Sequence, residues 1–174
     1  MLKKVFTIFA AFMLLGFIGK AQVFHDRVLL GVQIPNSDFK ETHKVGYGLD
    51  YSVRFLSDIG LSYGLSIGYG MFDRKDKTTS MGYLNVNGSL EYYFGKNFGV
   101  EFGENGLFCG FDMGYNGLWI DTKDKNSGAI GSFCLSPTIG YNYGPIFIAT
   151  KYNIIKNYNW FSVNIGVVLL RSDF

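Results

Sequence analysis

The sequence predicts an all-β protein: a closed, up-and-down transmembrane barrel of eight antiparallel strands that follows a cleaved signal peptide. The main observation is that long stretches alternate between apolar or aromatic residues and small or polar ones, as in a strand with two different faces. A second observation is the composition, with 23 glycines, 18% aromatic residues and three prolines, which is unusual for a soluble globular domain. A third is that no helical apolar segment follows the N-terminal one.

The N-terminal segment "MLKKVFTIFAAFMLLGFIGKAQ" has the order of a secretory signal peptide: basic Lys3 and Lys4, an apolar run, then small Ala21. The run from Val5 to Gly19 is shorter than the ~20 residues that a membrane-spanning helix needs. We therefore favour cleavage after Ala21 over an uncleaved anchor. Residues 1–21 are the expected signal peptide, and residues 22–174 the expected single barrel domain.

The charge of the chain gives no support for a nucleic-acid partner. The whole sequence carries a formal charge of +2, from 16 basic and 14 acidic residues. Removing Lys3, Lys4 and Lys20 with the signal peptide leaves 13 basic against 14 acidic residues, a charge of −1. The basic excess belongs to the targeting segment, so no nucleic-acid binding is expected.

The first two strands differ in clarity. The stretch 24–34, "FHDRVLLGVQI", alternates most weakly, with Arg27, Gly31 and Gln33 on its polar side. The stretch 44–55, "KVGYGLDYSVRF", alternates most cleanly, with Asp50 and Arg54 on the polar side. Its other face is entirely apolar or aromatic.

Six further stretches repeat the pattern. In order they are 60–72 "GLSYGLSIGYGMF", 81–94 "MGYLNVNGSLEYYF", 106–119 "GLFCGFDMGYNGLW", 130–143 "IGSFCLSPTIGYNY", 145–154 "PIFIATKYNI" and 160–170 "WFSVNIGVVLL". Cys109 and Cys134 fall on opposite faces of their strands, which favours free thiols over a disulfide. Pro137 lies inside a strand, where it removes a backbone donor and predicts a bulge or irregularity.

The last strand does not keep one phase to its end. Val168 and Leu170 are in phase with Phe174, whereas Phe161 to Leu169 run in the opposite phase and Ser172 interrupts the terminal set. Either a bulge near Val167–Val168 shifts the register, or the pattern at the C-terminus is imperfect.

The connectors are of two kinds. "NSDFKETH", "DRKDKTTS" and "DTKDKNSG" are charged and loop-like, whereas "LSDI", "YGP" and "KNYN" are short and "GKNFGVEFGEN" is longer than a tight turn. An even number of strands places both termini at one end of the barrel. We expect the charged loops at the other end.

The apolar faces are the ones expected to touch lipid. They are long and carry aromatic residues near strand ends, while the opposite faces are rich in Gly, Ser and Asn rather than the Lys and Glu of a solvated surface. A soluble lipocalin-like barrel is the less favoured alternative. The aromatic residues expected near the ends are Tyr69, Tyr92, Phe94, Trp119, Tyr141, Tyr143 and Trp160. The residues expected to face lipid include Val45, Tyr47, Leu49, Tyr51, Val53, Leu65, Ile67, Val163 and Ile165.

With this pattern, the chain resembles the small eight-stranded outer-membrane β-barrel proteins of Gram-negative bacteria, of the OmpA-domain and OmpX kind. The "GKAQ" end of the signal and the Tyr-, Asn- and Gly-rich strands look like members from Bacteroidota. The resemblance implies export to the outer membrane, contact with its lipid and lipopolysaccharide, and a monomeric state. It also implies that the barrel assembly machinery reads the terminal aromatic residue, here Phe174.

The polar faces should meet inside the barrel. The residues expected in this lumen network are Asp50, Arg54, Glu91, Asp112, Lys151, Asn85, Asn87 and Asn164. Eight strands leave an interior only wide enough for side chains, so we expect a plugged lumen and a structural or surface-interaction role. The alternative is a barrel that passes or binds a small solute.

Catalysis, metals and cofactors find little support. Some small outer-membrane barrels modify lipids with His, Ser and acidic groups, but this chain has two histidines. We expect His25 at the membrane interface and His43 solvated in the first outer loop. No nucleophile elbow, phosphate-binding loop or zinc spacing appears, so no catalytic, metal or cofactor residue is assigned.

Overall fold

The computed structural model describes residues 21–57, 59–75, 79–94, 105–122 and 128–173. Nearly all of the expected signal peptide, residues 1–20, lies outside these ranges, as does Phe174. No helix within the described ranges is both long and apolar enough to cross a membrane.

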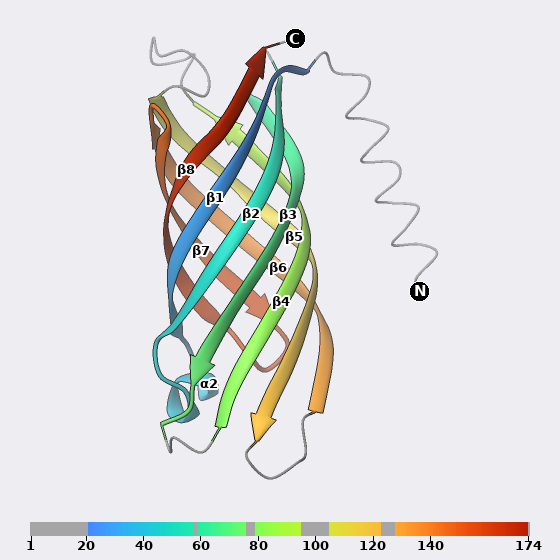
Figure 1. The fold of residues 1–174 in the computed structure, drawn as a ribbon, viewed down its shortest axis with the longest axis vertical. Coiled ribbons are helices and arrows are strands. Elements are labelled where there is room, and N and C mark those ends of the chain that lie inside the picture. The colour runs from blue at the N-terminus through green and yellow to red at the C-terminus, as the bar shows by residue number, and fades with distance from the viewer. Residues whose placement is uncertain (1–20, 58, 76–78, 95–104, 123–127, 174) are drawn as a thin grey trace, which may run out of the picture.

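Eight strands form one closed barrel in the order β1 to β8, and β8 closes on β1 (Figure 1). All neighbouring strands are antiparallel, which confirms the fold expected from the sequence. The strands are β1 (Ala21–Pro35), β2 (Gly46–Ser57), β3 (Leu61–Asp73), β4 (Thr79–Tyr93), β5 (Asn105–Thr122), β6 (Gly128–Tyr143), β7 (Ile146–Ile155) and β8 (Trp160–Asp173).

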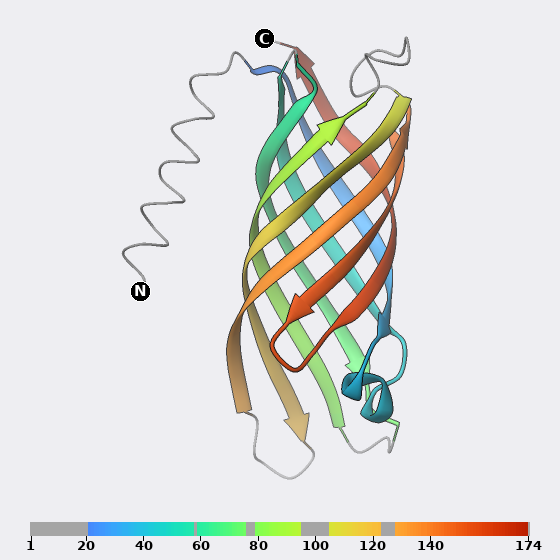
Figure 2. The ribbon, with the colours of Figure 1, turned by 180° about the vertical axis from the view of Figure 1, so that it is seen from behind.

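The two ends of the barrel differ. The start of β1 and the end of β8 lie at one end, which we call the terminal rim, together with the joints after β2, β4 and β6 (Figures 1 and 2). The opposite end, the loop rim, carries the joints after β1, β3, β5 and β7. The first of these was expected to be a loop, but it contains a short helix, α2 (Asp38–Thr42).

Two strand irregularities were expected, at Pro137 and near Val167–Val168, and the structure shows the form of each. At Pro137 the pairing with β7 is interrupted between Leu135↔Ile154 and Thr138↔Lys151, but the register on either side is the same. The irregularity expected at Pro137 is therefore present as a gap in the pairing and not as a bulge, because the missing N–H removes a ladder hydrogen bond without adding a residue. Where β8 pairs with β1, Asp26 of β1 is opposite Leu170 and Arg27 is opposite Val168. Leu169 of β8 is therefore an extra residue and forms a bulge close to the position expected.

The barrel wall is taller on one side than on the other. β5 and β6 remain paired as far as Ile120↔Gly128, near the tip of their hairpin. β7 is shorter and first meets β6 at Ile155↔Cys134. Figure 2 shows the consequence: the β5–β6 hairpin extends well beyond the β7–β8 hairpin at the loop rim.

Candidate functional site: the lumen and the outer face

The middle of the lumen holds a network of buried ion pairs. Arg54 joins two acids, at 3.2 Å from its Nη2 to Oε1 of Glu91 and 3.6 Å to Oδ1 of Asp112. Lys151 donates to Oδ2 of Asp112 at 2.7 Å. These side chains come from β2, β4, β5 and β7, on opposite sides of the wall, so the network ties strands together across the interior.

Arg27 completes this network and was missing from the set expected in the lumen. Its Nη1 donates to Oε2 of Glu91 at 3.1 Å, and its Nη2 to the hydroxyl of Tyr93. The guanidinium also lies 5.0 Å from the ring centre of Phe147. Arg27 has the same strand phase as Gly31 and Gln33, and this pattern was the sequence signal for its inward direction. With Arg27, the ion pairs join three bases to two acids, Glu91 and Asp112, and Asp50 is a third acid on the inner face.

The remaining expected lumen residues also point inward. Asp50 is half-buried, whereas Asn85, Asn87 and Asn164 are buried. Asp50 lies over Gly68, where a Cβ would come within 1.7 Å of Oδ1 of the carboxylate. Glycine at such positions makes room inside a narrow barrel for the large side chain of a neighbouring strand.

Apolar clusters lie at both ends of the polar middle. Toward the terminal rim, Arg27 borders a cluster of Leu29, Leu56, Tyr93, Phe108, Phe147 and Ala149. Toward the loop rim, a second cluster consists of Phe39, Phe72, Met81, Tyr83, Leu118, Cys134, Ile155 and Trp160. Between them, the cavity beside the ion pairs has room for about one water molecule.

Phe39 and Trp160 come from different parts of the chain to build the loop-rim cluster. Phe39 extends from α2 into the mouth of the barrel and is 3% exposed, with its ring 4.9 Å from that of Phe72. Trp160 is 1% exposed and packs 5.0 Å from Tyr83. The expectation that Trp160 lies on the outer aromatic face is therefore wrong, because as the first residue of β8 it points inward.

The outer face carries the apolar halves of the strands. Of the residues expected to face lipid, Val53 is half-buried and the others are exposed: Val45, Tyr47, Leu49, Tyr51, Leu65, Ile67, Val163 and Ile165. Exposure reaches 67% at Tyr47 and 56% at Ile165.

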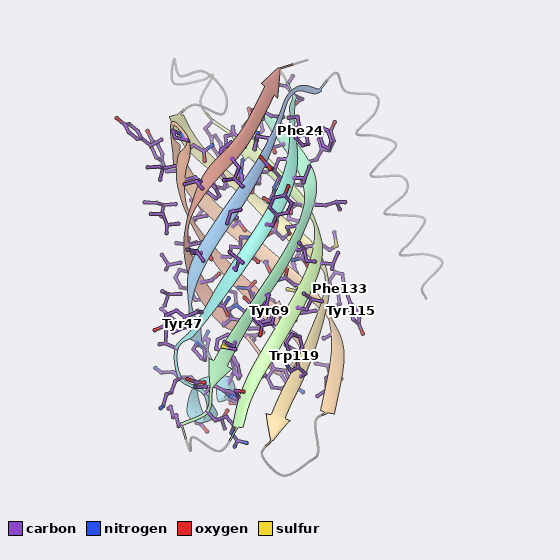
Figure 3. All side chains as sticks on the ribbon, in the orientation of Figure 1. Phe24, Tyr47, Tyr69, Tyr115, Trp119 and Phe133 are labelled. Atoms are coloured by element: carbon purple, nitrogen blue, oxygen red, sulfur yellow. The ribbon has the colours of Figure 1, made fainter. Side chains whose placement is uncertain are left out.

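Aromatic side chains on this outer face gather at two levels. In Figure 3, Phe24 lies near the terminal rim, where its ring centre is 5.5 Å from that of Phe55, which is in turn 5.7 Å from that of Tyr63. A second group lies in the half of the barrel nearer the loop rim. We call this second group the loop-side aromatic belt; it consists of Tyr47, Tyr69, Tyr115, Trp119 and Phe133. Tyr69 and Trp119 contact each other across strands, at 5.8 Å between ring centres.

The histidines lie in different surroundings from those expected. His25 is buried on the inner face of β1, with Nε2 at 2.8 Å from Nη2 of Arg27. His43 is 8% exposed and packs against the ring of Phe39 at 4.3 Å, so it is not a solvated loop residue.

Cys134 is buried, Cys109 is exposed, and both are free thiols. Among the described residues, no group of His, Cys, Asp or Glu is arranged to hold a metal ion.

Solved structures with the same architecture are outer-membrane β-barrels. Neisserial surface protein A matches with a TM-score of 0.61 and 14% identity, over 87% of this chain and 97% of that chain. Ail, the attachment invasion locus protein of Yersinia pestis, matches with a TM-score of 0.55 and 11% identity, over 87% and 99%. The N-terminal β-barrel domain of Pseudomonas aeruginosa OprF matches with 0.55 and 10%, over 83% and 97%.

These similarities show the fold, and the closed strand order of the barrel agrees with them. The chain therefore has the fold of the small eight-stranded outer-membrane β-barrel proteins. No family model matches the sequence, and no curated protein matches it.

Proposed function

We propose that the chain is an integral outer-membrane protein of a Gram-negative bacterium, with a lumen closed by side chains. Its barrel is a scaffold that holds the loop rim outside the cell for structural or surface interactions. The observation that carries the proposal is the inverted polarity of the wall, with ion pairs inside and apolar residues exposed outside. Contiguous exposed apolar surface of this extent is rare on monomers in water.

The barrel satisfies what a bilayer demands of a β-structure. Every strand has a partner on each side over its central part, and β8 closes on β1. In hydrocarbon, each unpaired backbone group would cost several kcal/mol, so closure is required there. The aromatic residues at two levels suit the two membrane interfaces, where Trp and Tyr rings are enriched.

Closure of the lumen is the second part of the proposal. A solute would have to displace paired charges in the middle and an aromatic cluster at each end. Breaking a buried ion pair is costly because it leaves an uncompensated charge. These features support a structural barrel over a solute pore.

Orientation and partners follow from the export pathway that we propose. A chain delivered by a signal peptide keeps the terminal rim in the periplasm and presents the loop rim outside. The partners proposed are outer-membrane lipid and lipopolysaccharide, with the barrel assembly machinery acting on the C-terminus during insertion. The protein acts as a monomer, and we assign it no catalytic residue.

Two experiments test this. The folded barrel should partition with outer membranes and migrate on gels at a different apparent size before and after heating. Recovery of the protein in the aqueous periplasmic fraction would contradict membrane insertion. In planar bilayers, we expect no stable single-channel currents from the refolded protein; such currents would contradict the closed lumen and favour the solute pore.

A further inference from the structure

The outer face of the barrel wall carries an acid, Asp26, in the half of β1 nearer the terminal rim. Asp26 alternates with His25 and Arg27, which are buried in the lumen, so its own side chain faces outward. Among the strand residues whose side chains the structure describes, Asp26 and Asp73 are the charged residues on this outer face. Asp73 is the last residue of β3, at the loop rim. Asp26, in contrast, lies within a strand and between paired neighbours on both sides.

Asp26 lies closer to the middle of the barrel than the aromatic residues of the terminal rim. Phe24 lies near that rim, in contact with Phe55 of β2 (Figure 3). Asp26 follows Phe24 by two residues on the same face, which is about 7 Å farther along the strand. Aromatic rings on a membrane barrel mark the level of the lipid headgroups. Asp26 is therefore expected just beneath the headgroups, where a carboxylate without a partner is costly.

The described residues supply the Asp26 carboxylate with one hydrogen bond and no cation. The Tyr51 hydroxyl donates to Oδ2 of Asp26 at 3.2 Å. Oδ1 is enclosed by the wall and has no hydrogen-bond partner. None of the ion pairs among the described residues includes Asp26. Because an ionised carboxylate can accept about four hydrogen bonds, Asp26 keeps capacity for a donor that comes from outside the barrel.

The wall beside Asp26 is irregular at the same height. On the β2 side, Asp26 is opposite Val53 in a regular register. On the β8 side, the bulge at Leu169 lies at the step between Asp26 and Arg27. A bulge bends its strand and changes the direction of nearby side chains, and bulges are frequent beside functional sites. The acid without a cation and the bulge are separate observations that coincide at one place on the wall.

We propose that Asp26 and Tyr51 form a binding site for the primary ammonium group of an aminophospholipid in the periplasmic leaflet of the outer membrane. This inference rests on the proposed location and orientation of the barrel. The ammonium has three N–H donors, and one of them donates to Oδ2 of Asp26 in a charge-assisted hydrogen bond. The acyl chains of the lipid lie farther along the wall, over Leu30, which is 62% exposed, and its partner Leu49, which is 47% exposed.

A lipid suits this site better than a second copy of the chain does. Two copies that pack β1 against β1 about a two-fold axis would bring two Asp26 carboxylates together. Like charges in such an interface repel each other, and the described residues near Asp26 supply no cation to separate them. An aminophospholipid brings one cationic group and two apolar chains. These match one acid at the edge of an exposed apolar surface.

The test uses the refolded full barrel in detergent micelles. Phosphatidylethanolamine and phosphatidylcholine with identical acyl chains are added in turn, and bound lipid is counted by native mass spectrometry. Phosphatidylcholine is the control because its quaternary ammonium has the same charge but no N–H donor. We expect phosphatidylethanolamine to bind at least about tenfold more tightly, as one charge-assisted hydrogen bond implies. Equal binding of the two lipids would overturn the proposal.

Two matched variants locate the site, because each removes one outward carboxylate. Asp26→Asn keeps an oxygen that can accept from Tyr51, and it should abolish the preference for phosphatidylethanolamine. Asp73→Asn removes the acid at the other rim and should leave the preference unchanged. A preference that persists in Asp26→Asn, or an equal loss in both variants, would overturn the site. A dimer of the natural protein that Asp26→Asn abolishes would also overturn it, since a second copy would then be the occupant.

Failure of this inference can be told apart from failure of the proposed function. Heat-modifiable gel migration shows whether each variant folds into the membrane barrel. A protein that folds and inserts into the outer membrane but shows no preference between the two lipids contradicts the lipid site alone. Recovery of the protein in the aqueous periplasmic fraction contradicts the proposed function itself.

Discussion

The two faces of the barrel wall differ in polarity, although they are built from neighbouring residues of the same strands. In β2, Leu49 is 47% exposed on the outside, while the next residue, Asp50, points into the lumen. Charges on the inner face are buried away from water and need partners. The outer face carries no charges over most of its height. A single substitution should therefore be costly inside when it removes a charge, and costly outside when it adds one.

Removal of Asp112 should give the largest effect, because this acid is the partner of both Lys151 and Arg54. We expect Asp112→Leu to lower the free energy of unfolding by about 3–5 kcal/mol, since it leaves a buried cation uncompensated. Urea titrations followed by heat-modifiable gel migration measure this. The double variant Asp112→Leu/Lys151→Met should recover much of the loss. If the double variant is as unstable as the single one, the ion pair is not the cause.

On the outer face, the largest cost is expected from a charge at mid-height. Ile165 is exposed, and its partners across the two neighbouring strands are Leu30 and Ile148, both also exposed. Ile165→Arg should cost ~2–4 kcal/mol of unfolding free energy in lipid vesicles. Ile165→Thr provides an uncharged polar control of smaller effect. A stabilised or unchanged Ile165→Arg protein would mean that this face meets water.

The same charge at Leu49 should be cheaper. Leu49 lies two residues from Tyr47 in the loop-side aromatic belt, so an arginine there can extend its guanidinium to the interface. We expect Leu49→Arg to cost about 1 kcal/mol or less, as charges near the interfaces do. The measurement is the difference from Ile165→Arg in the same vesicles. Equal costs at both positions would place the membrane boundary elsewhere.

The smallest effect is expected from Asp50→Asn. In the described ion pairs, Arg27, Arg54 and Lys151 are bound by Glu91 and Asp112 and not by Asp50. The asparagine side chain also has nearly the same shape as the aspartate that lies over Gly68. The unfolding free energy should change by less than about 1 kcal/mol. A loss comparable to that of Asp112→Leu would show that Asp50 is an essential member of the network.

Some of the lumen could be predicted from the sequence and some could not. The inward direction of Asp50, Arg54 and Glu91 follows from alternation, which depends on each strand alone. Alternation does not say which charges meet: Arg27 and Glu91 are 64 residues apart and touch only because the barrel closes. Arg27 lies in the stretch that alternates most weakly, so alternation gives less information about the direction of its side chain.

Alternation along the chain predicts the number of strands and the face on which most of their residues lie, because a period of two is a property of the local backbone. Register and closure of the barrel control the features that alternation did not predict: the inward position of Trp160 and the placement of Phe39 in the mouth of the barrel. Tertiary structure also decided that the β5–β6 hairpin extends past the β7–β8 hairpin at the loop rim, because strand lengths have consequences only once neighbours are aligned.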